Sequence, residues 1–195
     1  MPIFHSYKTV FIHIPKCGGS SVEKAFDINT RKNDTFCSDT MFGENSQHYT
    51  YDEILCKSKK DVSKYFSFAF VRNPWSRLVS EYFWRRNILN TFKDCSFLEF
   101  IKNIVPTHKG VHFKQQSEFI LDSNDNILID YIGKIETFDT DWAHVCNIIN
   151  KDTRSLCKAN RTSHKHYTKY YNNESREIVA TLYARDIKCF DYDFV

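Results

Sequence analysis

The stretch TVFIHIPKCGGSSVEKAF, residues 9–26, decides which fold the sequence predicts. Its first part, residues 9–14 (TVFIHI), is short, mostly apolar and rich in β-branched side chains, as expected for a buried strand. The next five residues, PKCGG, interrupt this pattern, and either Ser20 or Ser21 can then cap a helix with an apolar face. We therefore expect a strand, a tight loop and a helix in succession.

The rest of the sequence repeats this alternation of strands and helices. Two pairs have the spacing of a capping box at a helix start, Thr50–Glu53 and Ser96–Glu99. Further strands are predicted at residues 65–71, 127–132 and 134–137, and helices from residue 74 and over 97–105, 141–150 and 173–186. This order predicts an α/β fold: a three-layer, P-loop-like domain with a central, mainly parallel sheet flanked by helices. We expect one domain over residues 1–195.

The composition is that of a globular protein. Of the 195 residues 42% are hydrophobic, and the formal net charge of +3 is too small to indicate a nucleic-acid partner, although it suits one local anion pocket. No stretch approaches the roughly 20 apolar residues of a membrane span, and the N-terminal residues lack the apolar core of a signal peptide. The seven scattered cysteines show no CxxC spacing, so we expect no zinc site and a cytoplasmic protein.

The loop between the first strand and its helix has the chemistry of an anion site. Two adjacent glycines let the main chain approach an anion closely, a lysine adds a positive charge, and two serines add hydroxyl donors. The candidate anion-binding residues are Lys16, Cys17, Gly18, Gly19, Ser20 and Ser21. The alternative is a plain Gly-Gly turn with a surface lysine.

This loop differs from the usual P-loop. That motif, G-x-x-x-x-G-K-[ST], places the lysine after the glycines and follows it with a magnesium-binding hydroxyl. Here Lys16 precedes Gly18 and Gly19, so a magnesium-dependent kinase or GTPase is disfavoured.

A second anion site is predicted where the strand at 65–71 meets the following helix. Arg72 stands at that junction and can grip a phosphate with two parallel hydrogen bonds, and Ser80 lies about two turns into the helix. A salt bridge at the helix start and a solvated serine are the alternative interpretation. Two anion sites imply a ligand with two separated anionic groups.

Together these segments resemble the sulfotransferase superfamily. FIHIPKCGGSSVEKAF resembles its 5′-phosphosulfate-binding loop, and FAFVRNPWSRLVSEYFW resembles its 3′-phosphate-binding segment. The sequences of these two motifs most resemble those of the carbohydrate, Golgi-type branch that includes heparan sulfate 2-O-sulfotransferase. Weaker similarity covers QHYTYDEI, DYIGKIETF, NRTSHKHYTKYY and DIKCFDYDF.

The resemblance implies a function. The donor would be 3′-phosphoadenosine 5′-phosphosulfate (PAPS), the product PAP, the acceptor a carbohydrate hydroxyl, and no metal would be required. Arg161 and Ser163 lie in the segment that can approach the nucleotide in this family. Cys17 is a departure, since many relatives carry threonine there, and the membrane anchor of Golgi members is not seen.

The acceptor hydroxyl needs a general base, and His48 is our choice. QHYTYDEI resembles a family segment with a catalytic histidine, and an imidazole has a pKa suited to proton transfer near neutral pH. An exposed loop histidine is the alternative. His13, inside the first strand, is expected to be structural, and Glu23 is the second choice of base. Possible acceptor-site residues are His108, His112, His164 and His166.

Three other functions are alternatives to this one. A magnesium-dependent nucleotide kinase is opposed by the position of Lys16 and by the lack of a strand ending in a suitable aspartate. A non-catalytic PAP-binding module would bind nucleotide without turnover. The hypothesis of an RNA-binding protein has less support, because the basic and aromatic residues form no continuous stripe in the sequence.

Overall fold

The computed structural model of this chain describes residues 3–26, 46–152 and 164–195. The chain forms two compact units. Unit 1 consists of Met1–Val71 with Glu118–Asn160, and unit 2 consists of Arg72–Ser117 with Arg161–Val195. The single domain expected over residues 1–195 stays a prediction.

Unit 1 contains a four-stranded sheet with the strand order β1-β2-β3-β4. Strand β1 pairs antiparallel with β2, whereas β2, β3 and β4 run parallel, so that Ile12 lies beside Ala69 and Ala69 beside Ile132. The central strands β2 and β3 are mostly apolar and mostly buried, as expected for strands covered on both faces. The strands are Ile3–Phe4 (β1), Thr9–Ile12 (β2), Phe66–Val71 (β3) and Tyr131–Lys134 (β4).

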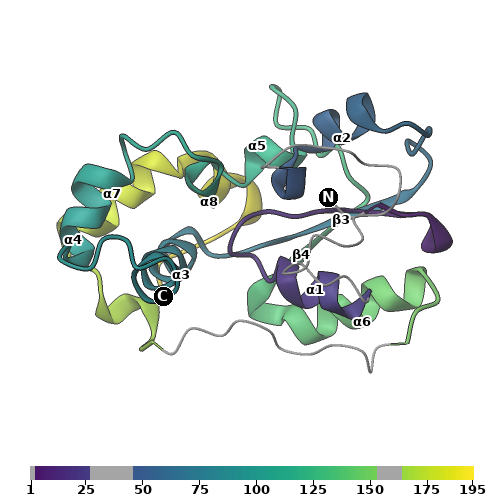
Figure 1. Cartoon of the computed structure of the whole chain (residues 1–195). Helices are drawn as coiled ribbons and strands as arrows, with labels where there is room; N and C mark the ends of the chain where they lie inside the picture. The colour runs from purple at the N-terminus through teal and green to yellow at the C-terminus, as the bar shows by residue number, and fades with distance from the viewer. Residues whose placement is uncertain (1–2, 27–45, 153–163) are drawn as a thin grey trace. The chain divides into compact units, whose positions relative to one another are not determined.

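Helices cover both faces of this sheet (Figure 1). Helices α1 and α6 lie on one side, where the Phe26 ring packs edge-on against Trp142 at 5.9 Å. Helix α2 lies on the other side and buries Ile54 completely. The expected three-layer α/β architecture with a mainly parallel sheet is therefore confirmed for unit 1. The helices are Gly19–Ala25 (α1), Tyr51–Lys57 (α2) and Phe138–Ile148 (α6).

Unit 2 is built from helices and loops in the part of the chain that the structure describes. One face of α3 packs Trp75, Leu78, Val79 and Tyr82 into an apolar core with aromatic side chains of the other helices. Its α-helices are Pro74–Asn87 (α3), Phe97–Glu99 (α4), Asn173–Leu182 (α7) and Ala184–Phe190 (α8), and a π-helix, Phe100–Ile104 (η3), continues α4. Helix α5, Ser117–Ile120, crosses the boundary between the two units.

Short 3-10 helices connect several of these elements. They are His5–Tyr7 (η1), Ser46–His48 (η2), Val111–Phe113 (η4), Ile135–Thr137 (η5) and Tyr167–Lys169 (η7). The strand predicted at residues 134–137 is therefore wrong, because after Lys134 the chain turns directly into η5 and α6.

Two other predictions needed correction at helix ends. Neither Ser20 nor Ser21 caps α1, which starts at Gly19 with Gly18 as its N-cap in a left-handed conformation. The helix predicted over 173–186 is two helices, because Tyr183 leaves helical geometry between α7 and α8. No helix within the described residues is long and apolar enough to cross a membrane.

Candidate functional site

The predicted anion loop of unit 1 lies between the end of β2 and the start of α1. Two of its residues have positive φ angles, Lys16 at 66° and Gly18 at 76°. A left-handed conformation is costly for a lysine, and such conformations gather at functional sites. The backbone oxygen of Gly18 accepts the amide of Ser21 at 2.9 Å, which closes the turn into the helix. The side chain of Lys16 is partly exposed, whereas Cys17 is buried.

Gly19 is required because of a close approach to a histidine. A Cβ atom at Gly19 would clash with Nε2 of His13, at a separation that two non-bonded heavy atoms do not tolerate. The imidazole of His13 therefore packs directly against the main chain of the loop. The second glycine of the motif therefore has a packing role, and its expected role in giving an anion access to the main chain stays a prediction.

A buried carboxylate holds this histidine in place. Oε1 of Glu23 lies 2.7 Å from Nδ1 of His13, and both side chains are buried. The side-chain amide of Gln47 donates to both oxygens of Glu23, at 3.1 and 3.0 Å. Burial alone would raise the pKa of Glu23, but the charge of His13 and the hydrogen bonds from His13 and Gln47 hold this pKa below its ordinary value.

His48 lies against the same cluster. Its Nδ1 is 2.8 Å from the backbone oxygen of His13, and the two imidazole rings meet edge to face at 4.6 Å. A carbonyl oxygen can only accept a hydrogen bond, so Nδ1 of His48 carries the proton and the lone pair of the neutral ring lies on Nε2. The sequence placed His48 on a loop, and the structure adds the contact with His13 that fixes its tautomer.

The predicted second anion site lies at the start of α3 in unit 2. Asn73 caps this helix by accepting the amides of Trp75 at 3.1 Å and Ser76 at 3.3 Å. Nε of Arg72 donates to Oγ of Ser76 at 3.0 Å, which holds the guanidinium beside the first turn.

Ser76 is a residue that the sequence reasoning missed. Arg72, Ser76 and Ser80 are spaced four residues apart, and side chains at this spacing share one face of a helix. The structure joins Arg72 to Ser76 directly, and the buried Ser80 follows one turn later. The spacing of four was the signal that could have found Ser76.

The other histidines considered for the acceptor site all lie in unit 2 and have local contacts of their own. His112 is 2.9 Å from Oε2 of Glu81 and stacks on Trp84, and His108 packs against Phe113. The ring of His164 stacks on Phe83, and Nδ1 of His166 is hydrogen-bonded with the hydroxyl of Thr168. Arg161 and Ser163, the predicted C-terminal nucleotide contacts, lie outside the described residues.

Comparison with known proteins places these motifs in a family. The sequence model of the sulfotransferase family matches residues 2–193, nearly the whole chain. The chain belongs to the sulfotransferase family. The match includes both the predicted anion loop of unit 1 and the Arg72 segment of unit 2 of this sulfotransferase.

One relative of this sulfotransferase has a shorter match. It is an uncharacterized protein of Archaeoglobus fulgidus, 29% identical over 111 residues, which are 57% of the present chain and 89% of the relative. No solved structure matches the chain significantly. Within the described residues, no group of three or more His, Cys, Asp or Glu side chains is arranged to hold a metal ion.

Proposed function

We propose that this sulfotransferase takes the sulfuryl group from PAPS and transfers it to a carbohydrate hydroxyl. One observation carries the choice of donor: the guanidinium of Arg72 is held on Ser76 at the N-terminus of a 14-residue helix. A helix N-terminus with an arginine and serine hydroxyls is suited to a phosphate group. This segment is distinct in sequence from the 16–21 loop, so the chain has two candidate anion sites, and a nucleotide with two separated anionic groups is a ligand that would use both.

The two sites receive different roles in this proposal. Lys16 and the main chain of Cys17, Gly18 and Gly19, with the hydroxyls of Ser20 and Ser21, bind the 5′-phosphosulfate and stabilise the leaving phosphate. Arg72 and Ser76, with Ser80, bind the 3′-phosphate, a group that ATP lacks. Arg161 and Ser163 are assigned to the nucleotide by family resemblance.

Proton transfer is assigned to His48. The acceptor oxygen attacks the sulfur, the bond from sulfur to the 5′-phosphate oxygen breaks, and PAP leaves with the electron pair. The hydroxyl proton passes to Nε2 of His48, the atom that holds the lone pair when Nδ1 donates to the carbonyl of His13. The products are a sulfate ester, PAP and a proton released from the imidazole.

The geometry disfavours Glu23 as the base. Its carboxylate accepts hydrogen bonds from His13 and Gln47, and its pKa lies below the ordinary value, so it holds a proton poorly. We assign it the task of orienting His13, which in turn contacts the loop and His48.

The carbohydrate acceptor is supported by resemblance. The segment that contains His48 is similar to the catalytic segment of heparan sulfate 2-O-sulfotransferases. A screen of sugars and oligosaccharides with radiolabelled PAPS tests this part of the proposal directly. If a peptide or a small phenol were labelled and no saccharide were, the acceptor would be of that class and not a carbohydrate.

Donor binding is tested without any acceptor. PAP at about a hundred times its dissociation constant should stabilise the protein by about 2.7 kcal/mol, measured by thermal unfolding in EDTA. Stabilisation by magnesium-ATP but not by PAP would contradict the proposal and indicate a magnesium-dependent nucleotide kinase instead. Binding of PAP without turnover of any acceptor, even at high enzyme concentration, would support the non-catalytic module.

A further inference from the structure

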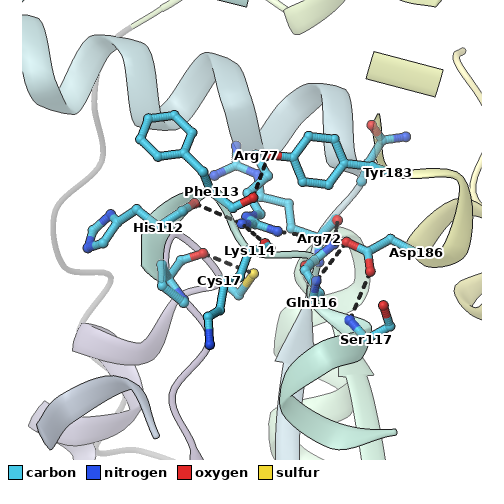
Figure 2. A network of polar contacts seen from close by, with 12 residues as sticks. Cys17, Arg72, Arg77, His112, Phe113, Lys114, Gln116, Ser117, Tyr183 and Asp186 are labelled. Carbon is cyan, nitrogen blue, oxygen red and sulfur yellow. Dashed lines mark hydrogen bonds and ion pairs between the residues drawn. The ribbon is translucent and has the colours of Figure 1, made fainter. Parts of the chain in front are cut away.

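The main chain of Arg72 is held by one buried side chain. Gln116 accepts the backbone amide of Arg72 on Oε1 at 2.8 Å and donates from Nε2 to the backbone oxygen of the same residue at 2.8 Å (Figure 2). Gln116 is fully buried, at 0% exposure. Both polar atoms of its side chain thus form hydrogen bonds with the main chain of one residue, 44 positions earlier in the chain.

A buried carboxylate holds Gln116 in turn. Oδ2 of Asp186 accepts the backbone amide of Gln116 at 2.8 Å and lies 3.3 Å from its Nε2, and Oδ1 accepts the amide of Ser117 at 2.8 Å (Figure 2). Asp186 itself is 0% exposed. Hydrogen bonds to a carboxylate are stronger than those between neutral groups, so they fix the position of Gln116 closely.

The segment that leads to Gln116 is tied to α3, the helix that follows Arg72. Nη2 of Arg77 donates to the backbone oxygens of His112 and Lys114, at 2.8 and 2.6 Å. Its Nη1 is 3.8 Å from Oδ2 of Asp186, an ion-pair distance within the same network. Helix α3 therefore contains both Ser76, which accepts a hydrogen bond from Arg72, and Arg77, which holds the segment before Gln116.

Arg72 is in this way fixed at both ends. Gln116 holds its main chain, and Ser76 receives its Nε. Burying an ionised carboxylate and an amide opposes folding unless their hydrogen bonds are complete, and apolar side chains avoid this cost. A polar network at this place is therefore best explained by the orientation that it gives to Arg72 rather than by stability alone.

We propose that Gln116 and Asp186 are positioning residues for recognition of the donor's 3′-phosphate. Gln116 fixes the direction in which the side chain of Arg72 leaves the main chain, and Asp186 fixes the position of Gln116. Neither needs to touch the nucleotide. The inference rests on the proposed function, because it assumes that Arg72 binds the 3′-phosphate.

The test compares two nucleotides that differ by that phosphate alone. Gln116→Met keeps the approximate volume and removes both hydrogen bonds to Arg72. We expect its dissociation constant for PAP to rise roughly 10-fold, because charged contacts depend on orientation, while that for adenosine 5′-phosphate changes less than about 2-fold. Isothermal titration calorimetry on the full chain measures both. Asp186→Asn should change the same ratio in the same direction.

The matched control is a comparable clamp in unit 1. Oδ2 of Asp130 accepts both the amide and the hydroxyl of Ser67, each at 2.7 Å. Asp130→Asn weakens that clamp and should leave the preference for PAP over adenosine 5′-phosphate unchanged. Circular dichroism and thermal unfolding establish that each variant is folded, and Asp186→Asn replaces Gln116→Met if the latter does not fold.

The outcomes separate this inference from the proposed function. A wild-type protein that does not prefer PAP over adenosine 5′-phosphate overturns the proposed function and the inference together. A wild-type preference that survives in folded Gln116→Met and Asp186→Asn overturns the inference alone. Equal weakening of both nucleotides also overturns it, because that result assigns Gln116 to general structure.

Discussion

At His48, one hydrogen bond decides which ring nitrogen can receive a proton. The carbonyl of His13 takes the Nδ1 proton, so Nε2 is the basic atom of the neutral ring. If His48 is the base, His48→Ala should lower turnover about 10²–10⁴-fold and leave PAP affinity nearly unchanged. Single-turnover measurements with an accepted acceptor are appropriate, because product release can hide the chemical step.

His5 offers a matched control for this experiment. It also lies in unit 1, where its Nδ1 is 3.0 Å from the hydroxyl of Tyr65. His5→Ala should retain the wild-type turnover. A folded His48→Ala variant with normal PAP binding and more than half of the wild-type activity would end the assignment.

Glu23 makes a second residue-scale prediction, on stability. Its pKa is lowered in the folded protein, so the folded state binds this proton less readily than the unfolded chain does. Its stabilising contribution is therefore complete above the unfolded-state pKa of about 4.3 and is lost as the pH falls through the lower folded-state pKa. Glu23→Gln should reduce the free energy of unfolding by about 1–3 kcal/mol at neutral pH, through weaker hydrogen bonds to His13.

Urea unfolding at several pH values measures this effect. The difference between wild type and Glu23→Gln should be constant from neutral pH to about pH 5 and should shrink below about pH 4. Glu174, whose ion pair with Lys102 is half exposed, supplies a control with almost no difference. A difference that does not change with pH would mean that the charge of Glu23 has no role in stability.

At the scale of elements, the start of α3 combines a helix cap with the proposed 3′-phosphate site. Asn73 satisfies the first amides, and Ser76 receives Arg72. Ser76→Ala should raise the dissociation constant for PAP roughly 5-fold, because the guanidinium loses the partner that orients it. The free energy of unfolding should change little, since Asn73 still caps the helix.

Ser96 provides the opposite pattern. It caps α4 through a capping box with Glu99, so Ser96→Ala should reduce stability by about 1 kcal/mol and leave PAP affinity unchanged. Titration calorimetry and urea unfolding on both variants give the two quantities. Unchanged PAP affinity in Ser76→Ala would remove Ser76 from the proposed 3′-phosphate site.

Local chemistry explains which elements could be predicted. Helix caps act within one helical turn, as do the capping boxes at Thr50 and Ser96 and the cap at Asn73. All three of these helices begin where the sequence indicated. The break at Tyr183 has no proline or glycine signal. In the turn after Lys134, the carboxylate of Asp141 accepts the amide of Lys134 and the hydroxyl of Thr137, contacts that no helix or strand pattern in the sequence indicates. These two elements were therefore mispredicted.

At the scale of the whole molecule, the sheet was predictable and the support of the site was not. Buried apolar strands separated by helices are typical of parallel pairing, and β2, β3 and β4 pair in that way. The contacts of Gln116 with Arg72 and with Asp186 span 44 and 70 residues. No periodicity or spacing relates positions so far apart, so only a structure reveals them.

The same separation has a consequence for the order in which the protein becomes competent during synthesis. Arg72 and Gln116 leave the ribosome well before Asp186, which follows Gln116 by 70 residues. At typical translation rates that interval lasts roughly 4–14 s. During it the nascent chain lacks the carboxylate that holds Gln116. If Gln116 and Asp186 position Arg72 as proposed, premature termination before Asp186 would yield a product deficient in donor selectivity, even if its earlier segments had folded.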